Sequence, residues 1–140
     1  MSKLHLKIIT PQKIALEEDV FSVTAPTLQG EITVLPRHVN LFTLLIEGII
    51  KFKSFSQEKY LAIGGGYLET DGEEVNILVA RAYGQNEIDA KITEQAIEEA
   101  KKTLKQAKDQ TDRNQAVSLL RRSLIDMKLL KRRKHVQTSV

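Results

Sequence analysis

Residues with the chemistry for catalysis or metal binding are few and widely separated in this sequence of 140 residues. The histidines His5, His38 and His135 lie far apart and lack the close spacing of metal ligands. The absence of cysteine excludes a disulfide framework, a cysteine metal site and a thiol nucleophile. The carboxylates at 17–19 follow a turn and are expected to be solvated. The sequence therefore predicts no enzyme active site, no metal site and no cofactor.

Three consecutive glycines, Gly64, Gly65 and Gly66, are a second candidate for chemistry. A glycine-rich loop holds phosphate when a helix follows, because the free amides at the helix start face the anion. Here residues 67–70 follow, and their composition predicts a strand. The glycines are therefore interpreted as a β-bulge or a close backbone approach, in preference to a phosphate site.

A third candidate is the stretch 29–40, which predicts a turn, a short strand and a stop. Gly30 can adopt the positive φ that a tight turn needs. Pro36 fixes φ and lacks an amide proton, so it ends the strand. Arg37 and His38 are then left in an exposed loop, where contacts with partners tend to lie.

Charge is distributed unevenly along the chain. Residues 1–85 hold 8 Lys and Arg against 10 Asp and Glu, a net charge of −2, whereas residues 86–140 hold 13 against 8, a net charge of +5. A basic segment can bind nucleic acid, anionic lipid or an acidic protein surface, or it can simply be a solvated helix face. No aromatic residue follows Tyr83, which disfavours stacking on single-stranded nucleic acid but leaves open a non-specific phosphate contact.

Residues 1–85 have the pattern of a β-domain. Short runs alternate between apolar and polar residues, as in 4–9 and 49–55, and Asp71-Gly72 is a hairpin signal between two of them. Pro26 and Gly30 are expected to bracket a connection. The pattern predicts an antiparallel β-sandwich or barrel, and the sandwich is the fold expected here.

The hydrophobic period changes after Gly84. Apolar residues recur at helical spacing from Ile88 to Ala107 and again from Ala116 to Leu130. Asn86 or Asp89 can cap the first helix, and Asp112 begins a run that resembles a capping box for the second. Residues 86–140 are therefore predicted to form an antiparallel two-helix hairpin, which makes the fold class α+β.

No apolar run approaches the roughly 18 residues that a membrane span requires. The start of the chain also lacks the apolar block of a signal peptide. A cytoplasmic location is expected.

Several of these motifs together resemble the epsilon subunit of bacterial F-type (rotary) ATP synthase. Gly-Glu-x-x-x-Leu-Pro-x-His occupies 30–38, and a glycine-rich pattern ending in Glu occupies 64–69. The segments 6–11 and 75–80 are similar to the first and last strands of the family. The resemblance covers nearly the whole chain and preserves the order of sandwich and hairpin.

The resemblance implies a non-catalytic central-stalk subunit of a proton-translocating ATP synthase, peripheral to the cytoplasmic face of the membrane. Its sandwich, 1–85, would bind the gamma subunit through an apolar face and the membrane rotor ring through Glu31, Arg37 and His38. Arg37 replaces the usual glycine of the family's Pro-Gly-His turn, and Asn40 replaces a usual proline. The loop is therefore expected to be more basic than in relatives.

The resemblance also implies that the hairpin, 86–140, regulates ATP hydrolysis. Arg121, Arg122 and Lys128 are then expected to contact an acidic segment of the alpha and beta catalytic subunits. The alternative from another class of function is a β-sandwich module with a basic helical arm that binds nucleic acid.

Some family members bind ATP in the hairpin through Ile/Leu-Asp-x-x-Arg-Ala and two arginines in the second helix. Of that pattern this chain keeps Asp89 and Arg122, while Ile92 and Asp126 stand where arginines are expected. A carboxylate at the second position would repel phosphate. Weak or no ATP binding is predicted.

Overall fold

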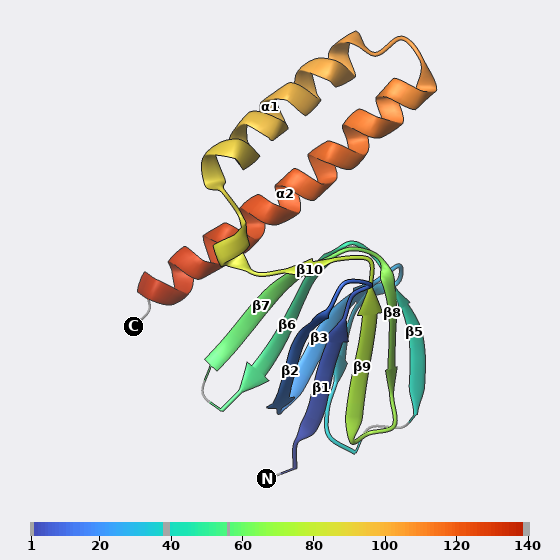
Figure 1. Cartoon of the computed structure of the whole chain (residues 1–140), viewed down its shortest axis with the longest axis vertical. Helices are drawn as coiled ribbons and strands as arrows, with labels where there is room; N and C mark the ends of the chain where they lie inside the picture. Colours follow the sequence, from blue (N-terminus) through green and yellow to red (C-terminus); the bar gives the residue numbers. More distant parts are fainter. Residues whose placement is uncertain (1, 38–39, 56, 139–140) are drawn as a thin grey trace. The chain divides into compact units, whose positions relative to one another are not determined.

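The computed structural model describes residues 2–37, 40–55 and 57–138, with 133–138 as backbone only. The chain divides into two compact units, residues 1–84 and 85–140. The first is a β-sandwich and the second is a pair of helices, as predicted for an α+β chain (Figure 1).

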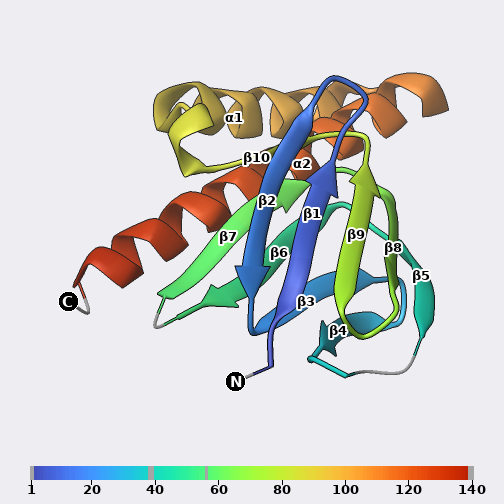
Figure 2. The ribbon, with the colours of Figure 1, turned by 60° about the horizontal axis from the view of Figure 1, so that its bottom comes forward.

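The described part of the first unit contains ten strands in two five-stranded sheets (Figure 2). Sheet 1 has the order β2-β1-β9-β8-β5, and sheet 2 has the order β10-β7-β6-β3-β4. The strands are β1 (Leu4–Ile9), β2 (Ile14–Val20), β3 (Ser22–Thr27), β4 (Gly30–Val34), β5 (Leu41–Leu45), β6 (Gly48–Ser54), β7 (Gln57–Ile63), β8 (Gly66–Thr70), β9 (Glu74–Val79) and β10 (Ala82–Tyr83).

Pairing in both sheets is antiparallel except between β1 and β9, which run parallel from His5↔Glu74 to Ile9↔Leu78. The predicted hairpin at Asp71-Gly72 is confirmed as the β8–β9 turn. Gly72 has φ +93°, a conformation that glycine adopts without a steric penalty.

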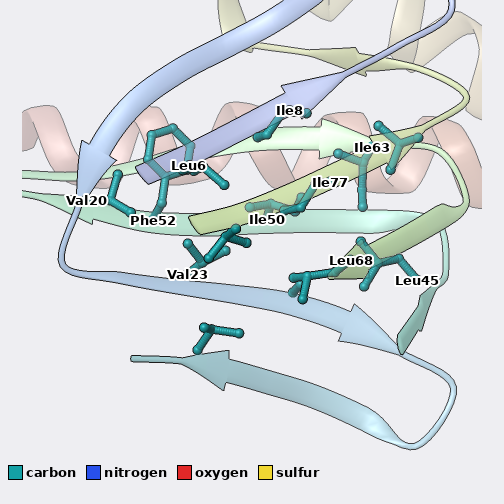
Figure 3. Packing of buried hydrophobic residues seen from close by; sticks show 14 of the residues in the cluster. Leu6, Ile8, Val20, Val23, Leu45, Ile50, Phe52, Ile63, Leu68 and Ile77 are labelled. Carbon is teal, nitrogen blue, oxygen red and sulfur yellow. The ribbon is translucent and has the colours of Figure 1, made fainter. Parts of the chain in front are cut away.

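The core lies between the two sheets, where inward-facing residues of alternate positions meet (Figure 3). In β1, Leu4, Leu6 and Ile8 are fully buried while their neighbours point outward. Phe52 of β6 is the largest fully buried side chain. The period of two in the sequence therefore identifies the buried face of the sheets correctly.

One strand boundary differs from expectation, because Pro26 lies inside β3 instead of in a connection. The residues of β3 that pair with β6 are Ser22 to Thr24, so Pro26 lies beyond that pairing. Its missing amide proton therefore removes no bond to β6, and the strand continues to Thr27.

The second unit consists of a 3₁₀ turn, η1 (Gln85–Glu87), and two helices, α1 (Ala90–Gln106) and α2 (Gln110–Thr138). Asp89 caps α1, with its carboxylate accepting from the amide of Ile92 at 3.0 Å. The predicted capping box at Asp112 is wrong. Asp109 accepts from the amide of Asp112 at 2.8 Å, because α2 begins earlier and leaves that amide in its first turn.

None of the described helices is long and apolar enough to cross a membrane. Although α2 has 29 residues, charged side chains recur along its whole length.

Candidate functional site

The outer face of sheet 1 carries a row of apolar side chains that crosses all five strands. The register pairs Leu44 with Tyr67, Tyr67 with Leu78, Leu78 with Ile9, and Ile9 with Ile14. We call these five residues the apolar row. Leu44 and Ile14, at its two ends, are 65% and 55% exposed.

Phe42 extends this surface toward the β8–β9 turn. Its ring lies 5.1 Å from the ring of Tyr67, centroid to centroid, and the residue is 60% exposed. Contiguous exposed apolar surface on a folded domain marks a site of interaction with another molecule. Alternation along single strands did not reveal this row, because its members come from five strands and align only through the register.

An acidic groove of about 460 Å³ borders the apolar row. The side chains of Glu69, Asp71 and Glu74 contribute its carboxylates. The remaining lining residues are Asn40, Leu41, Phe42, Thr70 and Asn76. Asp71 accepts from the amides of Glu74 and Glu73, and these bonds hold its pKa below the ordinary value.

A second charged cluster lies on the outer face of β1 and β2. His5 is hydrogen-bonded to Asp19 at 2.9 Å and to Glu17 at 2.7 Å. The two carboxylates raise the pKa of His5, and the bond to His5 together with Lys7 lowers the pKa of Glu17. Among the described residues, no group of three or more His, Asp or Glu is arranged to hold a metal ion.

The predicted loop site extends along β4, which is an edge strand of sheet 2. Gly30 opens the strand with φ +114°, and Pro36 follows its end. Arg37 has φ +67° and donates its amide to the carbonyl of Gly72 at 2.8 Å. Glu31 and Arg37 are both exposed.

Glu31 is the second residue of β4, and Arg37 lies in the turn that follows the end of the strand. His38, the third predicted member of this site, lies outside the described residues.

The three glycines lie where β7 passes into β8. A Cβ on Gly66 would come within 1.9 Å of the carbonyl oxygen of Leu78, and one on Gly64 within 2.9 Å of the Arg81 guanidinium. Gly65 accepts from the amide of Ala80 at 3.0 Å. Because β8 follows and no helix does, the glycines serve close backbone contacts between neighbouring segments.

In the helical unit, Arg121, Arg122 and Lys128 are exposed on α2. Within the described residues no hydrogen bond or ion pair joins Asp89 to Arg122, and the Asp89 carboxylate is engaged as the α1 cap. Ile92 is 64% exposed. The described hairpin therefore does not assemble the residues of the ATP motif into one contact.

Residues 3–85 match the family described as ATP synthase, delta/epsilon chain, beta-sandwich domain. The ATP synthase epsilon chain of Moorella thermoacetica is 36% identical over 129 residues, which cover 91% of this chain and 96% of the relative. The chain belongs to the ATP synthase epsilon chain family. The epsilon chain of Halalkalibacterium halodurans is also 36% identical, over 88% of this chain and 93% of the relative.

A chain in the cryo-EM structure of the Euglena gracilis mitochondrial ATP synthase has the same fold, with a TM-score of 0.75 and 23% identity. The alignment covers 98% of this chain and 82% of that chain. As an ATP synthase epsilon chain, the protein is a non-catalytic stalk subunit of the complex. The apolar row, the β4 edge and the glycines all lie within the matched residues 3–85 of the epsilon family.

Proposed function

We propose that this epsilon chain connects the membrane rotor ring to the gamma subunit of a proton-translocating ATP synthase and regulates ATP hydrolysis through its hairpin. The observation that supports this most directly is the apolar row on an epsilon-family sandwich. A stalk subunit that transmits torque needs a broad apolar contact with its neighbour, and the row offers one. The family favours this function over a basic arm for nucleic acid.

The apolar row is proposed as the face that binds gamma. Its members come from five strands of one sheet, so they are held on a rigid surface that loses little entropy on binding. Exposed leucine and isoleucine side chains on this face would be removed from water in the complex. Burial of such surface is worth about 25 cal/mol per Å² before the costs of association.

Purified gamma provides the test. Leu44→Ser combined with Leu78→Ser should weaken gamma binding by at least about tenfold, since both side chains would lose apolar burial. Leu28→Ser is the matched control, because Leu28 is 83% exposed on the β3–β4 turn and outside the row. Equal binding by the double variant and the control would contradict the assignment of this face.

The β4 edge is proposed to contact the rotor ring through Glu31, Arg37 and His38. This assignment places the chain at the cytoplasmic face of the membrane as a peripheral subunit. Alanine at Glu31 and Arg37 should lower ATP synthesis driven by proton flow in reconstituted vesicles, while gamma binding stays unchanged. Unchanged coupling in the variant would argue against this edge as the ring contact.

The cationic hairpin is proposed to restrain ATP hydrolysis by binding acidic surface on the alpha and beta subunits. Arg121, Arg122 and Lys128 are exposed and supply charge that steers an acidic partner. Truncation after Gly84 should raise the ATPase rate of the assembled complex. A rate equal to that of the full-length complex would remove the regulatory role.

ATP itself is proposed to bind weakly or not at all. Asp89 is engaged as a helix cap, and Asp126 puts a carboxylate where the family motif has an arginine. Calorimetry of the whole chain with magnesium-free ATP should show no binding below millimolar concentrations. A sub-millimolar dissociation constant would overturn this expectation.

A further inference from the structure

The outer face of sheet 1 specifies the charge of its partner as well as its apolarity. We propose that the gamma segment bound to the apolar row carries basic side chains along one flank, and that Glu69 and Glu74 bind that flank. This inference rests on the proposed function, in which gamma occupies the face. The inference adds that the gamma segment is basic and that its basic side lies toward the β8–β9 turn.

The register places the carboxylates beside the apolar row. Glu69 is paired with Phe42 on one side and Asn76 on the other, one outward-facing row away from Leu44, Tyr67 and Leu78. That step of two residues along a strand is about 7 Å. Glu74 lies one outward-facing step further along β9 than Asn76. Glu74 is therefore about 14 Å along β9 from Leu78, so the basic side chains must lie on the flank of the segment that extends toward the β8–β9 turn.

Two of the three groove carboxylates, those of Glu69 and Glu74, differ from the bonded acids of this face. Glu17 and Asp19 are bonded to His5, and Asp71 is bonded to backbone amides. Among the described residues, no hydrogen bond or ion pair is made by the side chains of Glu69 and Glu74, and both are exposed.

One cation on this face, Lys7, is directed to another acid. Lys7 is paired by register with Asn76, but its ammonium lies 4.0 Å from Glu17 on the opposite side. Among the described residues, Glu69 and Glu74 therefore keep carboxylates without an ion pair next to apolar surface. A basic segment would neutralise this negative charge. An acidic segment would be repelled by it, and a purely apolar segment would desolvate it without a compensating partner.

The dimensions of the face define the segment further. Five strands spaced about 4.8 Å apart make the apolar row about 19 Å long. The complementary gamma surface should present apolar side chains over that length across the strands. Its basic side chains should lie on the side facing the β8–β9 turn, with none required on the side facing the β1–β2 connection.

The experiment measures binding of the full chain to purified gamma as a function of salt. Glu69→Gln combined with Glu74→Gln should raise the dissociation constant roughly five- to thirty-fold at low ionic strength, with most of the effect in the association rate. The difference from wild type should shrink in high salt, because screening weakens exposed charge pairs. Glu69→Lys with Glu74→Lys should weaken binding further.

Glu98→Gln with Glu99→Gln is the matched control, since it removes the same charge from exposed positions of α1. Its affinity for gamma should equal that of wild type. If wild type binds gamma but the groove variant binds equally well at every salt concentration, the charge inference is wrong and the proposed function stands. If wild type does not bind gamma, the proposed function fails first.

The same variants decide between gamma and a second copy of the chain, whose basic unit of residues 85–140 also has complementary charge. Sedimentation of the wild type alone should show a monomer at the concentrations used for gamma binding. Self-association that disappears in the Glu69→Gln, Glu74→Gln variant would identify the second copy as the occupant and overturn the assignment to gamma.

Discussion

The sandwich and the helical hairpin of this chain are stabilised in different ways. The sandwich buries a continuous cluster of large side chains that includes Phe52, Leu68 and Ile77. The buried positions of α1 are the small residues Thr93 and Ala100. Because stabilisation scales with the apolar area removed from water, each buried residue of α1 contributes much less than a core leucine.

This difference contrasts a rigid sheet surface with a helical element whose buried side chains are mostly small. The outer face of sheet 1 is fixed by hydrogen-bonded strands and a dense core. The described helices bury mainly small side chains, with Leu129 of α2 as the exception, and residues 85–140 carry a net positive charge. The sandwich therefore suits the proposed contacts that need fixed geometry, and the helices suit the proposed regulatory role.

The largest expected effect comes from replacing a large buried side chain of the sandwich core by alanine. Phe52→Ala should reduce the free energy of unfolding of the sandwich by about 3–5 kcal/mol, because it leaves a cavity at a fully buried site. Leu104→Ala, at a half-buried position of α1, should cost about 1 kcal/mol. Urea unfolding followed by circular dichroism measures both. Equal losses would refute the contrast between the units.

The next effect tests whether close backbone contact prevents a larger residue from replacing Gly66. Gly66→Ala should destabilise the sandwich by about 1–3 kcal/mol, since its Cβ would lie 1.9 Å from the carbonyl oxygen of Leu78. Gly65→Ala is the matched control, because its Cβ would meet only the carbonyl oxygen of Leu45 at 3.6 Å. Thermal unfolding of the two variants should therefore differ clearly.

A smaller effect should be confined to the hairpin. Asp89→Ala removes the side chain that accepts from the amide of Ile92, and loss of a helix cap costs about 1 kcal/mol. Amide exchange should increase in the first turn of α1, while the strands keep their protection. Asp89→Asn is the control that retains an accepting oxygen.

The smallest effect is a pH dependence of the outer sheet face. Asp19 and Glu17 raise the pKa of His5, so the folded chain holds the His5 proton more tightly than the unfolded chain. The resulting stability is fully present below pH 6.5, the ordinary pKa of His5, and is lost as pH rises through its folded value. Unfolding measured across this range for wild type and His5→Gln should converge at alkaline pH.

Much of the fold could be predicted because local patterns agree with it. Alternation in β1, the Asp71-Gly72 turn and the change of period after Gly84 each have a direct structural cause in the chain. The parallel pairing of β1 with β9 could not be predicted, because it joins segments that are far apart in sequence. The prediction that Pro26 lies in a connection is wrong. Proline is accommodated in β3 because the pairing of β3 with β6 stops before it, and the sequence does not show where that pairing stops.

The candidate site was less accessible to sequence reasoning. Arg37 and Phe55 have positive φ, a conformation that local rules assign to glycine. The resemblance implies a glycine at the position of Arg37, and glycine would adopt this positive φ without a steric penalty. The apolar row depends on register between five strands, which single-strand patterns do not contain. The roles of Glu31, Arg37, His38 and the α2 cations stay predictions.

The parallel pair at the centre of sheet 1 has a consequence for how the chain is made. β1 is the first strand to be synthesised, yet its neighbour β9 ends only at Val79. Until that point is translated, the nascent β1 has β2 on one edge and nothing native on the other. The complete sandwich can therefore form only after β9 is available, and the long-range β1–β9 contacts slow its folding relative to local helix formation.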